Sequence, residues 1–400
     1  MKEFKILLSF SLTFFFITPH GLSQELVKGP YIQNVQKDRA TVCWVTQEAV
    51  VKFGMNPGSL EQKAVEFRVH ELLLDQLKPN TSYHYDIGFS EDGKGHFKTA
   101  PALGTAFRFV VVGDTRFADK PKEIQVALIA AIEKQRPALV VNTGDLVTDG
   151  LDPAHWDTFF EMNRNLLKSV PYYVSLGNHE KDSPYYYQYF SVPGRENYFS
   201  FNWSNCHFVI LDSEGAHVES EFPSDYQQRK AEAAKWEKFW DEQLTWLCND
   251  LMNHREFDFT LVFMHQPLFS LKESRREEQK EFQKRFAQIF EDFEVDIVFS
   301  GHDHSYQRHF VKPVHYVVTA GGGAGLYTMN KPFAKYTRKV VLEHHYLSVE
   351  VNGTQLQCTA LTEKGEIIDQ FAIPFDDQRD KNRAEKELRL NEEGTYDTWF

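Results

Sequence analysis

Short apolar runs recur along the chain from residue 107, and several of them end in polar, chemistry-bearing groups. The runs are Phe107–Val112, Ala138–Val141, Tyr172–Leu176, Phe259–Met264 and Val295–Ser300. Continuous apolar runs of this length are typical of strands that are buried on both faces of a parallel sheet. The chain is therefore expected to contain a sheet whose strands are joined through helices or loops.

Helical patterns lie between some of these runs. Residues Pro121–Gln135 carry apolar side chains at helical spacing, and Ala231–Asn253 contains an apolar stripe that includes Trp236, Trp240 and Leu244. The stripe is expected to pack in the core. From Val314 onward the sequence is strand-rich again. Alternating strands and helices predict an α/β fold, with the last portion completing a second sheet.

Chemistry-bearing residues cluster just after the predicted strands. They are Asp114, Asp145, Asn178, His179, His265, His302 and His304. Ligands of open α/β sheets bind at the carboxyl ends of strands, so these side chains are expected to converge. Glycine precedes four of the blocks and is expected to let the chain turn sharply there. Oxygen and imidazole donors without a thiolate suit Zn, Mn or Fe better than Ca.

The order of these blocks resembles the calcineurin-like metallophosphoesterase superfamily over roughly residues 107 to 320. The shared pattern is Asp, Gly-Asp, Gly-Asn-His-Asp/Glu, His and Gly-His-x-His. Gly177–Glu180, Val262–His265 and Gly301–Arg308 are most similar to the purple acid phosphatase branch. The resemblance implies a four-layer α/β/β/α sandwich with two metal ions per chain, of Fe, Zn or Mn.

The resemblance also implies a role for each residue. It assigns Asp114, Asp145 and His304 to the first metal, and Asp145, Asn178, His265 and His302 to the second, with His179 as general acid. The implied reaction is attack of a metal-bound hydroxide on the phosphorus of a small phosphorylated substrate. Phosphomonoester hydrolysis, as in acid phosphatases, is favoured. The alternatives are a phosphodiesterase of the same superfamily and a non-catalytic phosphate- or glycan-binding surface protein.

Two positions depart from the family pattern. Arg116 stands where diesterase members have a histidine ligand, and Thr148 stands where the purple branch has the tyrosine that colours its iron. We therefore predict no purple colour and a weaker or more exchangeable first metal site. Arg116 is a candidate for binding the substrate phosphate, since guanidinium makes bidentate contacts with phosphate. The alternative is a salt bridge with Asp119 or Asp149.

Other motif residues are expected to support the site rather than react. Tyr306 and Arg308 are expected to brace the loop that carries the last two histidines, and Glu180 to orient ligands. The stretch Gly321–Gly325 is expected to form a tight turn under the site, with a phosphate-binding nest as the alternative.

Residues 24–100 are predicted to form an all-β domain. Ala40–Val45 and Thr81–Ile87 are rich in strand-forming residues, and Leu77–Tyr85 resembles the tyrosine corner of immunoglobulin and fibronectin type III sandwiches. Lys28–Gln33 also resembles the fibronectin-like lead domain of the purple branch. The predicted α/β domain spans residues 105–375, and a charged tail spans 376–400.

The N-terminus indicates the compartment. Lys2 and Lys5 precede the apolar run Ile6–Ile17, and the small residues Gly21 and Ser23 follow. The run is shorter than the about 20 residues that a membrane span needs. Residues 1–23 are therefore predicted to be a cleavable signal peptide, and the mature protein to be secreted or periplasmic without a membrane span.

Charge and cysteine content narrow the partners. A formal net charge of −13 argues against a nucleic-acid-binding surface, which requires a basic face. Four cysteines without a Cys-x-x-Cys pair predict neither a disulfide scaffold nor a thiolate metal cluster.

Overall fold

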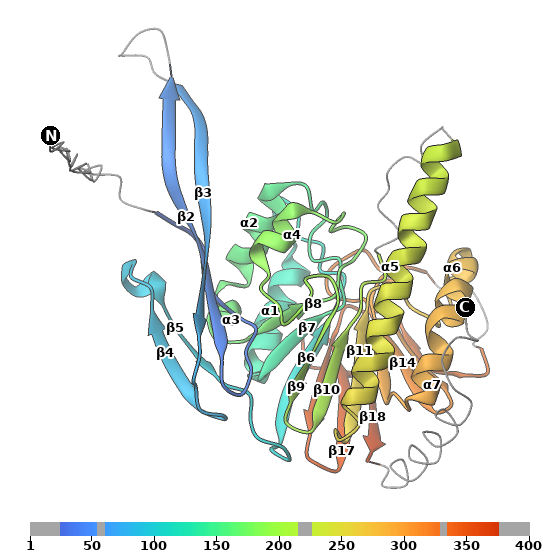
Figure 1. Cartoon of the computed structure of the whole chain (residues 1–400). Coiled ribbons are helices and arrows are strands. Elements are labelled where there is room, and N and C mark those ends of the chain that lie inside the picture. The colour runs from blue at the N-terminus through green and yellow to red at the C-terminus, as the bar shows by residue number, and fades with distance from the viewer. Residues whose placement is uncertain (1–24, 54–60, 215–225, 329–333, 376–400) are drawn as a thin grey trace, which may run out of the picture.

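The structure is a computed structural model that describes residues 25–53, 61–214, 226–328 and 334–375 (Figure 1). The predicted signal peptide 1–23 and the predicted tail 376–400 lie outside the described residues.

Two sheets form the body of the molecule (Figure 1). The first has the order β18-β17-β16-β6-β7-β8, and the second has the order β15-β13-β14-β12-β11-β10-β9. The strands of the first are β6 (Phe107–Val112), β7 (Leu139–Asn142), β8 (Tyr172–Val174), β16 (Tyr346–Val351), β17 (Gln355–Leu361) and β18 (Ile367–Pro374). Those of the second are β9 (Phe199–Trp203), β10 (Cys206–Ile210), β11 (Phe259–Met264), β12 (Ile297–Ser300), β13 (Tyr306–Val311), β14 (Val314–Thr319) and β15 (Thr337–Val341).

The strands that precede the chemistry-bearing residues run parallel to their neighbours. In the first sheet β6 pairs with β7 and β7 with β8, and in the second sheet β10, β11, β12 and β14 are paired in that order. Parallel strands place their carboxyl ends at one edge of a sheet, so each sheet presents one such edge.

Side-chain alternation along these strands explains why the body is layered. Phe109 and Val111 of β6 point into the apolar cluster between the two sheets, whereas Val110 and Val112 point into a cluster that helices cover. Both faces are apolar because both are covered, which is the reason for the continuous apolar run in the sequence.

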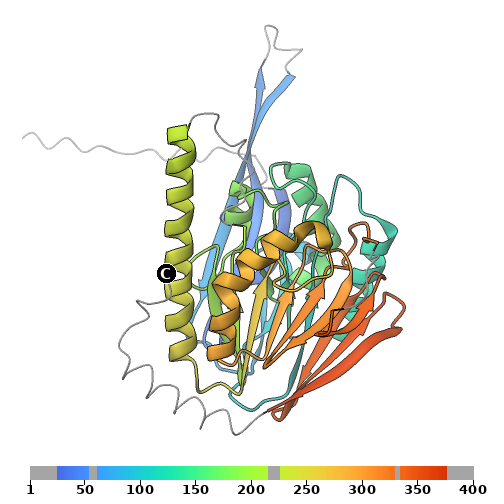
Figure 2. The same cartoon turned by 90° about the vertical axis from the view of Figure 1, so that its right-hand side faces the viewer.

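Helices cover the outer face of each sheet (Figures 1 and 2). The first sheet packs against α1 (Glu123–Gln135), α2 (Pro153–Met162), α3 (Arg164–Leu167) and α4 (Pro184–Tyr189). The second packs against α5 (Tyr226–Asn253), α6 (Arg276–Phe282) and α7 (Gln288–Asp292). The predicted α/β/β/α arrangement is confirmed. The α5 stripe lies in the core, as Trp240, Leu244 and Leu247 are all buried.

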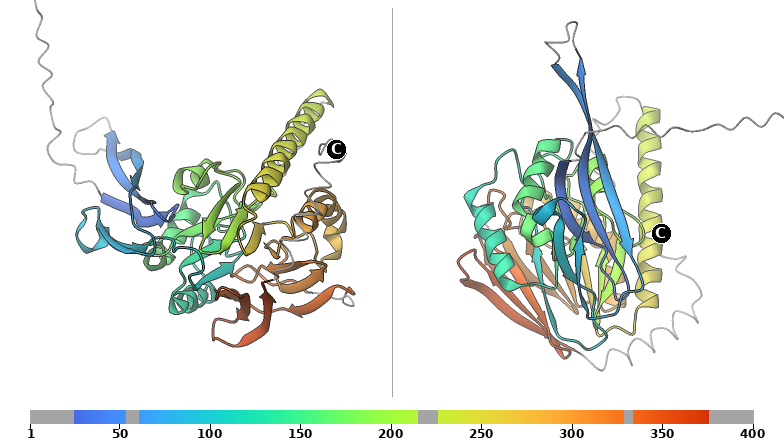
Figure 3. Two further views of the ribbon diagram at one scale, coloured as in Figure 1. Left: turned by 60° about the horizontal axis from the view of Figure 1, so that its bottom comes forward. Right: turned by 90° about the vertical axis from the view of Figure 1, so that its left-hand side faces the viewer.

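The region ahead of the body is all-β, as expected. An antiparallel sheet contains β1 (Glu25–Gln33), β2 (Ala40–Phe53) and β3 (Glu61–Leu74), and β4 (Ser82–Asp86) pairs with β5 (Lys94–Lys98). The β2–β3 hairpin extends well beyond the body (Figures 1 and 3). The backbone N–H of Lys78 donates to Tyr83 Oη at 2.8 Å, which is the contact that a tyrosine corner makes.

These N-terminal strands are packed directly on the α/β body. Tyr173 Oη on β8 donates to the carbonyl of Val35 at 3.0 Å, and Tyr85 Oη donates to that of Lys168 at 2.8 Å. The buried Lys28 ammonium pairs with Asp157 on α2. Ile32 and other N-terminal residues belong to the apolar cluster that fills the space between the two large sheets. The two regions therefore share one hydrophobic core.

Candidate metal centre

Residues from both sheets meet at the carboxyl ends of the parallel strands. Asp114, Asp145 and Asn178 follow β6, β7 and β8 of one sheet, whereas His265, His302 and His304 follow β11 and β12 of the other. Asp114 and His265 are fully buried, and Asp145, His302 and His304 are at most 9% exposed. The sandwich thus brings six predicted ligands from two sheets to one place.

Three of these residues form a compact donor group. Asp114, Asp145 and His304 each present a ligand atom, and these atoms all lie within 4.8 Å of one another. His304 Nε2 is 3.3 Å from Asp114 Oδ1. This is the set that the family resemblance assigns to the first metal.

The second predicted set surrounds the His265 ring. His265 Nε2 lies 3.2 Å from Asn178 Oδ1, 3.1 Å from His302 Nδ1 and 3.4 Å from Asp145 Oδ1. Asp145 thus faces both sets, in the position that a bridging ligand would occupy. The six residues are together in the structure, and their ligand roles stay a prediction.

The donor atoms suit a cation. His265 Nδ1 lies 2.8 Å from the carbonyl of Thr143, and because a carbonyl only accepts, this nitrogen carries the proton. The lone pair of Nε2 then faces the oxygens of Asp145 and Asn178. Lone pairs that face each other repel unless a cation lies between them, either a second proton on the ring or a metal ion, so the arrangement favours a cation.

His304 shows the same arrangement. Its Nδ1 lies 2.7 Å from the carbonyl of Gly325, which leaves the Nε2 lone pair directed at Asp114. The electric field at the site agrees, because although burial opposes protonation of His265, the nearby carboxylates, chiefly Asp145 and Asp114, raise its pKa to about 9. The site therefore attracts positive charge.

The backbone at the strand ends differs from the expectation for the glycines. Asp114, Asp145 and His302 themselves adopt left-handed conformations, with φ of 58°, 57° and 68°. Such φ values cost non-glycine residues about 1–3 kcal/mol each and are common where function needs them. Of the preceding glycines only Gly144 has a positive φ, at 97°. Gly177 instead provides space, since a Cβ there would lie 2.4 Å from the amide nitrogen of Asp145.

Glu180 holds two of these loops together. Its buried carboxylate accepts from the backbone N–H groups of Asp145 and Gly177 on Oε2, at 2.9 and 2.8 Å, and from that of Leu146 on Oε1 at 2.8 Å. Burial and the charge of Asp145 raise the pKa of Glu180, while the N–H donors oppose the rise. Its position matches the orienting role expected from the sequence.

His179 is held by the loop that carries Thr148. Its Nδ1 lies 2.6 Å from the Thr148 carbonyl, so this nitrogen carries the proton, and its Nε2 lies 4.0 Å from Asp145 Oδ2. Thr148 Oγ1 donates to the carbonyl of Arg116 at 3.0 Å. The Arg116 guanidinium lies 3.2 Å from His179 Nδ1, which places it beside the predicted acid.

The two carboxylates considered as salt-bridge partners of Arg116, those of Asp119 and Asp149, contact other residues instead. Asp149 pairs with Lys181 at 2.9 Å, and Asp119 lies 3.5 Å from His155 Nε2. The guanidinium of Arg116 is partly exposed at the site and beside His179. It is therefore positioned to reach a bound substrate.

Tyr306 and Arg308 brace the fold across the sandwich. Tyr306 Oη donates to Asp369 Oδ2 at 2.8 Å, and Arg308 Nε donates to the same oxygen at 2.6 Å. Asp369 lies on β18 of the opposite sheet, so the pair ties the two sheets together next to the Gly301–His304 loop.

The glycine-rich loop lies beneath the donor residues. The backbone N–H of Ala324 donates to the Asp114 carbonyl at 2.9 Å, and the Gly325 carbonyl accepts from His304. The loop thus supports both residues, in agreement with a tight turn under the site.

One residue that contacts a predicted ligand could not be identified from the sequence. The Tyr327 ring stacks on His304, with ring centroids 4.2 Å apart and planes at 22°. Its backbone N–H also donates to the His304 carbonyl at 2.9 Å. No motif or spacing identifies Tyr327, because its contact depends on how the loop after β14 folds back.

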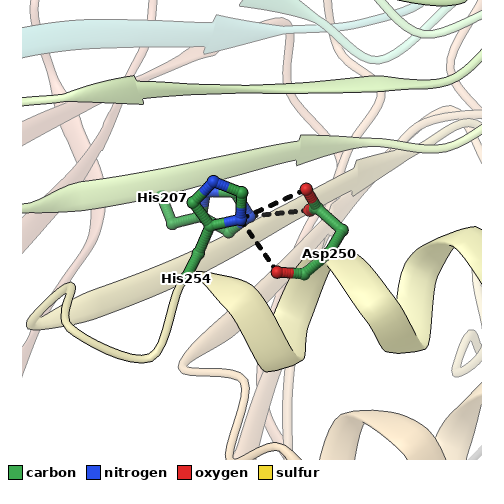
Figure 4. A group of neighbouring side chains, drawn as sticks. All are labelled: His207, Asp250 and His254. Carbon is green, nitrogen blue, oxygen red and sulfur yellow. Dashed lines mark hydrogen bonds and ion pairs between the residues drawn. The ribbon is translucent and has the colours of Figure 1, made fainter.

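A separate cluster of titratable side chains consists of His207, Asp250 and His254 (Figure 4). Asp250 near the end of α5 lies 2.8 Å from His207 Nε2 and 3.2 Å from His254 Nδ1. The two imidazole rings are stacked 4.1 Å apart at 13°, so one ion cannot lie in the plane of both rings. His254 Nδ1 also faces the Asp250 carbonyl at 2.8 Å and therefore carries a proton. The cluster fits a hydrogen-bonded core group rather than a metal site.

Comparison with known proteins gives a consistent result. A family model described as calcineurin-like phosphoesterase matches residues 107–306. Purple acid phosphatase 21 of Arabidopsis thaliana is 25% identical over 369 residues, which are 79% of this chain and 78% of that protein. Purple acid phosphatase 22 of the same plant is 25% identical over 313 residues, or 70% and 66% of the two chains.

A solved structure shows the same fold. A purple acid phosphatase from yellow lupin (Lupinus luteus) seeds superimposes with a TM-score of 0.67 at 18% identity, covering 87% of this chain and 74% of that one. None of the helices in the described part of the chain combines the length and apolar character needed to cross a membrane.

Proposed function

The chain belongs to the calcineurin-like phosphoesterase family, and on this premise we propose that it hydrolyses phosphate monoesters at a dinuclear metal centre. The proposed ligands are Asp114, Asp145, Asn178, His265, His302 and His304. The observation that carries the proposal is the pair of donor groups that share Asp145. The similarity to purple acid phosphatases favours monoesters over diesters.

Two metal ions in such a site neutralise phosphate charge and lower the pKa of a coordinated water, which supplies a nucleophile near neutral pH. The chain's own residues prepare the site for this chemistry. Backbone N–H groups hold the carboxylates in place: that of His302 donates to Asp114 Oδ2 at 2.9 Å, and that of His179 donates to Asp145 Oδ1 at 3.0 Å.

We assign to His179 the protonation of the leaving group. The Thr148 carbonyl holds its Nδ1–H and fixes the ring orientation, so that Nε2 is directed toward Asp145 and the site. A proton on Nε2 would pass to the ester oxygen as the bond to phosphorus breaks. Departure as an alcohol rather than an alkoxide lowers the barrier.

Arg116 is the proposed substrate-binding residue. Its guanidinium lies beside His179 and is always charged, so it can donate two parallel hydrogen bonds to oxygens of the phosphoryl group. Thr148 accounts for the placement, because its hydroxyl holds the Arg116 backbone.

We also propose that residues 1–23 direct secretion and are removed, and that the strands β1 to β5 form the lead region of the mature enzyme. The basic and apolar composition of the first 23 residues supports this. Amino-terminal sequencing of the exported protein tests it, with a start near Gln24 as the expected result.

The activity test compares an aryl phosphate monoester with its bis-aryl diester, with Mn, Fe or Zn added. The Asp145→Ala variant serves as the blank, since the loss of the shared carboxylate disrupts both donor groups. Asp119→Asn is the matched control, because it neutralises a carboxylate that is 76% exposed and belongs to neither group.

The expected result is hydrolysis of the monoester in preference to the diester by the wild type and by Asp119→Asn, with loss in Asp145→Ala. Metal content per chain, measured after dialysis, should fall only in Asp145→Ala. A preference for the diester would contradict the proposed substrate class. Equal activity in Asp145→Ala would contradict the metal-dependent mechanism.

A further inference from the structure

The aromatic ring of Tyr327 separates the metal centre from a lysine. One face of the ring is covered by His304, whose centroid is 4.2 Å away. Lys272 Nζ lies 3.9 Å from the centroid of the same ring. An imidazole stacked this closely leaves no room for an ammonium on its side, so Lys272 lies over the opposite face. The favourable contact of a cation with the ring face holds the ammonium there.

A second cation lies at the edge of this ring, but its charge is already balanced. Arg275 Nη2 donates to Tyr327 Oη at 3.3 Å, and its Nη1 lies 3.3 Å from Asp303 Oδ1. Asp303 is buried between the two histidines of the Gly301–His304 loop and also accepts from the Ser270 hydroxyl. Arg275 therefore orients Tyr327 and neutralises Asp303.

Lys272 differs in this respect. Among the residues that the structure describes, none places a carboxylate at ion-pair distance from its ammonium, although its charge, like that of Arg275, opposes the rise that burial causes in the pKa of Asp303. The side chain is partly exposed. The cation is placed beside the site in a chain of formal net charge −13. Such a chain repels anionic substrates except where a local cation attracts them.

Lys272, Tyr327 and His304 form one stack, so the ammonium lies one aromatic ring beyond a proposed metal ligand. Burial raises the pKa of the Tyr327 phenol, and the charges of Arg275, Asp114 and Arg116 all act on it. Two of the charges that act on this phenol are thus those of Asp114, a proposed metal ligand, and of Arg116, which lies beside His179. To reach the Lys272 ammonium, a leaving group bound at the metal centre would have to pass the edge of the Tyr327 ring.

We propose that Lys272 binds a second anionic group on the substrate, so that the preferred substrates are phosphate monoesters whose leaving group carries a carboxylate or another phosphate. The inference rests on the proposed phosphomonoesterase function and narrows its substrate class. The step remains hydrolysis, in which water replaces the leaving group on phosphorus and the alcohol departs with one proton. Tyr327 and Arg275 act as positioning residues, because Tyr327 holds the ammonium over its ring and Arg275 orients Tyr327.

A matched substrate series tests this assignment. Ethyl phosphate, phosphoethanolamine and 2-phosphoglycolate have leaving groups of similar size that are neutral, positive and negative, and ethylene glycol bisphosphate offers a second phosphate. The kcat/KM of each is measured for the wild type, Lys272→Met and Lys272→Arg. Lys280→Met is the control, because Lys280 is exposed on α6 and pairs with Glu277 at 2.7 Å.

In the wild type, 2-phosphoglycolate or the bisphosphate should be hydrolysed with about tenfold higher kcat/KM than ethyl phosphate. A factor of about ten is what one additional charge-assisted hydrogen bond to the substrate contributes. Lys272→Met should lose about tenfold on the anionic substrates and less than threefold on ethyl phosphate. Lys272→Arg should keep most of the preference, and Lys280→Met all of it. The larger loss identifies carboxylate or phosphate as the group that is bound.

Two results would overturn this inference and leave the proposed phosphomonoesterase function standing. One is a wild type that hydrolyses the neutral and anionic esters equally well. The other is a Lys272→Met variant that loses the same factor on every substrate, since the lysine would then act on the reacting phosphoryl group. A metal-loaded wild type that hydrolyses none of the esters would overturn the proposed function itself, and this inference with it.

Discussion

The substitution Glu180→Gln tests how the site is held together before any metal binds. The carboxylate of Glu180 receives two N–H groups on Oε2, at 2.9 and 2.8 Å, and two on Oε1, that of Leu146 at 2.8 Å and that of Val147 at 3.4 Å. A glutamine has one acceptor and one donor end. In its better orientation the amide oxygen keeps Asp145 and Gly177, but its NH₂ then faces the N–H groups of Leu146 and Val147.

The expected cost follows from this count. The N–H of Leu146 loses its acceptor, which costs about 1–3 kcal/mol, and that of Val147 loses a longer and weaker bond. The bonds to Asp145 and Gly177 become weaker without the charge. A loss of about 2–4 kcal/mol in the free energy of unfolding is expected for the metal-free protein. With an unfolding entropy of about 2.1 cal/mol/K per residue over 400 residues, the melting temperature should fall by about 2–5 °C.

Two measurements check the prediction. Thermal unfolding in the presence of a chelator measures the melting temperature of the metal-free protein. Metal titration measures the metal affinity, which should fall about 10–100-fold because the Asp145 and Gly177 loops are less well held. The exposed Glu366→Gln is the control, since it removes the same charge without a buried partner. A Glu180→Gln protein with unchanged melting temperature and metal affinity would refute the argument.

Three further predictions concern other parts of the molecule. His179→Asn should lower kcat about 10²–10⁴-fold for alkyl phosphates but less for p-nitrophenyl phosphate, whose leaving group needs no proton; equal losses would exclude the acid role. The hydrogen bond to Asp250 raises the pKa of His254, so its contribution to stability is present below the unfolded pKa and lost as the pH rises through the folded one. Urea unfolding should therefore show a deficit of His254→Gln that is larger at pH 6 than at pH 8.5, and a deficit independent of pH would contradict it. Tyr173→Phe should lower stability by about 1–3 kcal/mol, because the buried carbonyl of Val35 loses its donor. Fluorescence and circular dichroism should still report one unfolding transition, and a separate early transition would show that the N-terminal strands are not part of the shared core.

Much of the architecture could be predicted from local pattern. The bounds of β6 and β11 match the apolar runs 107–112 and 259–264, because a strand buried on both faces is continuously apolar. Strands with weaker signals were less evident. β9 alternates buried and half-buried residues and was not predicted, and the helix expected from Pro121 begins at Glu123.

The candidate site shows the same division between local and long-range information. The residue types at the strand ends and the glycines before them indicated where donors would gather. The reason that the glycines are needed is tertiary, since at Gly177 a side chain would collide with the backbone of Asp145. Likewise Thr148 reads as a missing ligand in the sequence, whereas in the structure its carbonyl holds His179.

By itself, the sequence determined which segments form buried strands and which donor residues follow them, because strand burial and strand-end chemistry are encoded in short segments. The layer order and the role of each ligand were implied by the family resemblance that these segments carry. Only the tertiary structure decided that Asp369 ties the two sheets through Tyr306 and Arg308, and that Tyr327 stacks between His304 and Lys272. These contacts join residues that are 23 to 63 positions apart or lie in different sheets. These contacts depend on the packing of the whole sandwich. The periodicity or motif of one segment does not specify which side chain of a distant segment will contact it.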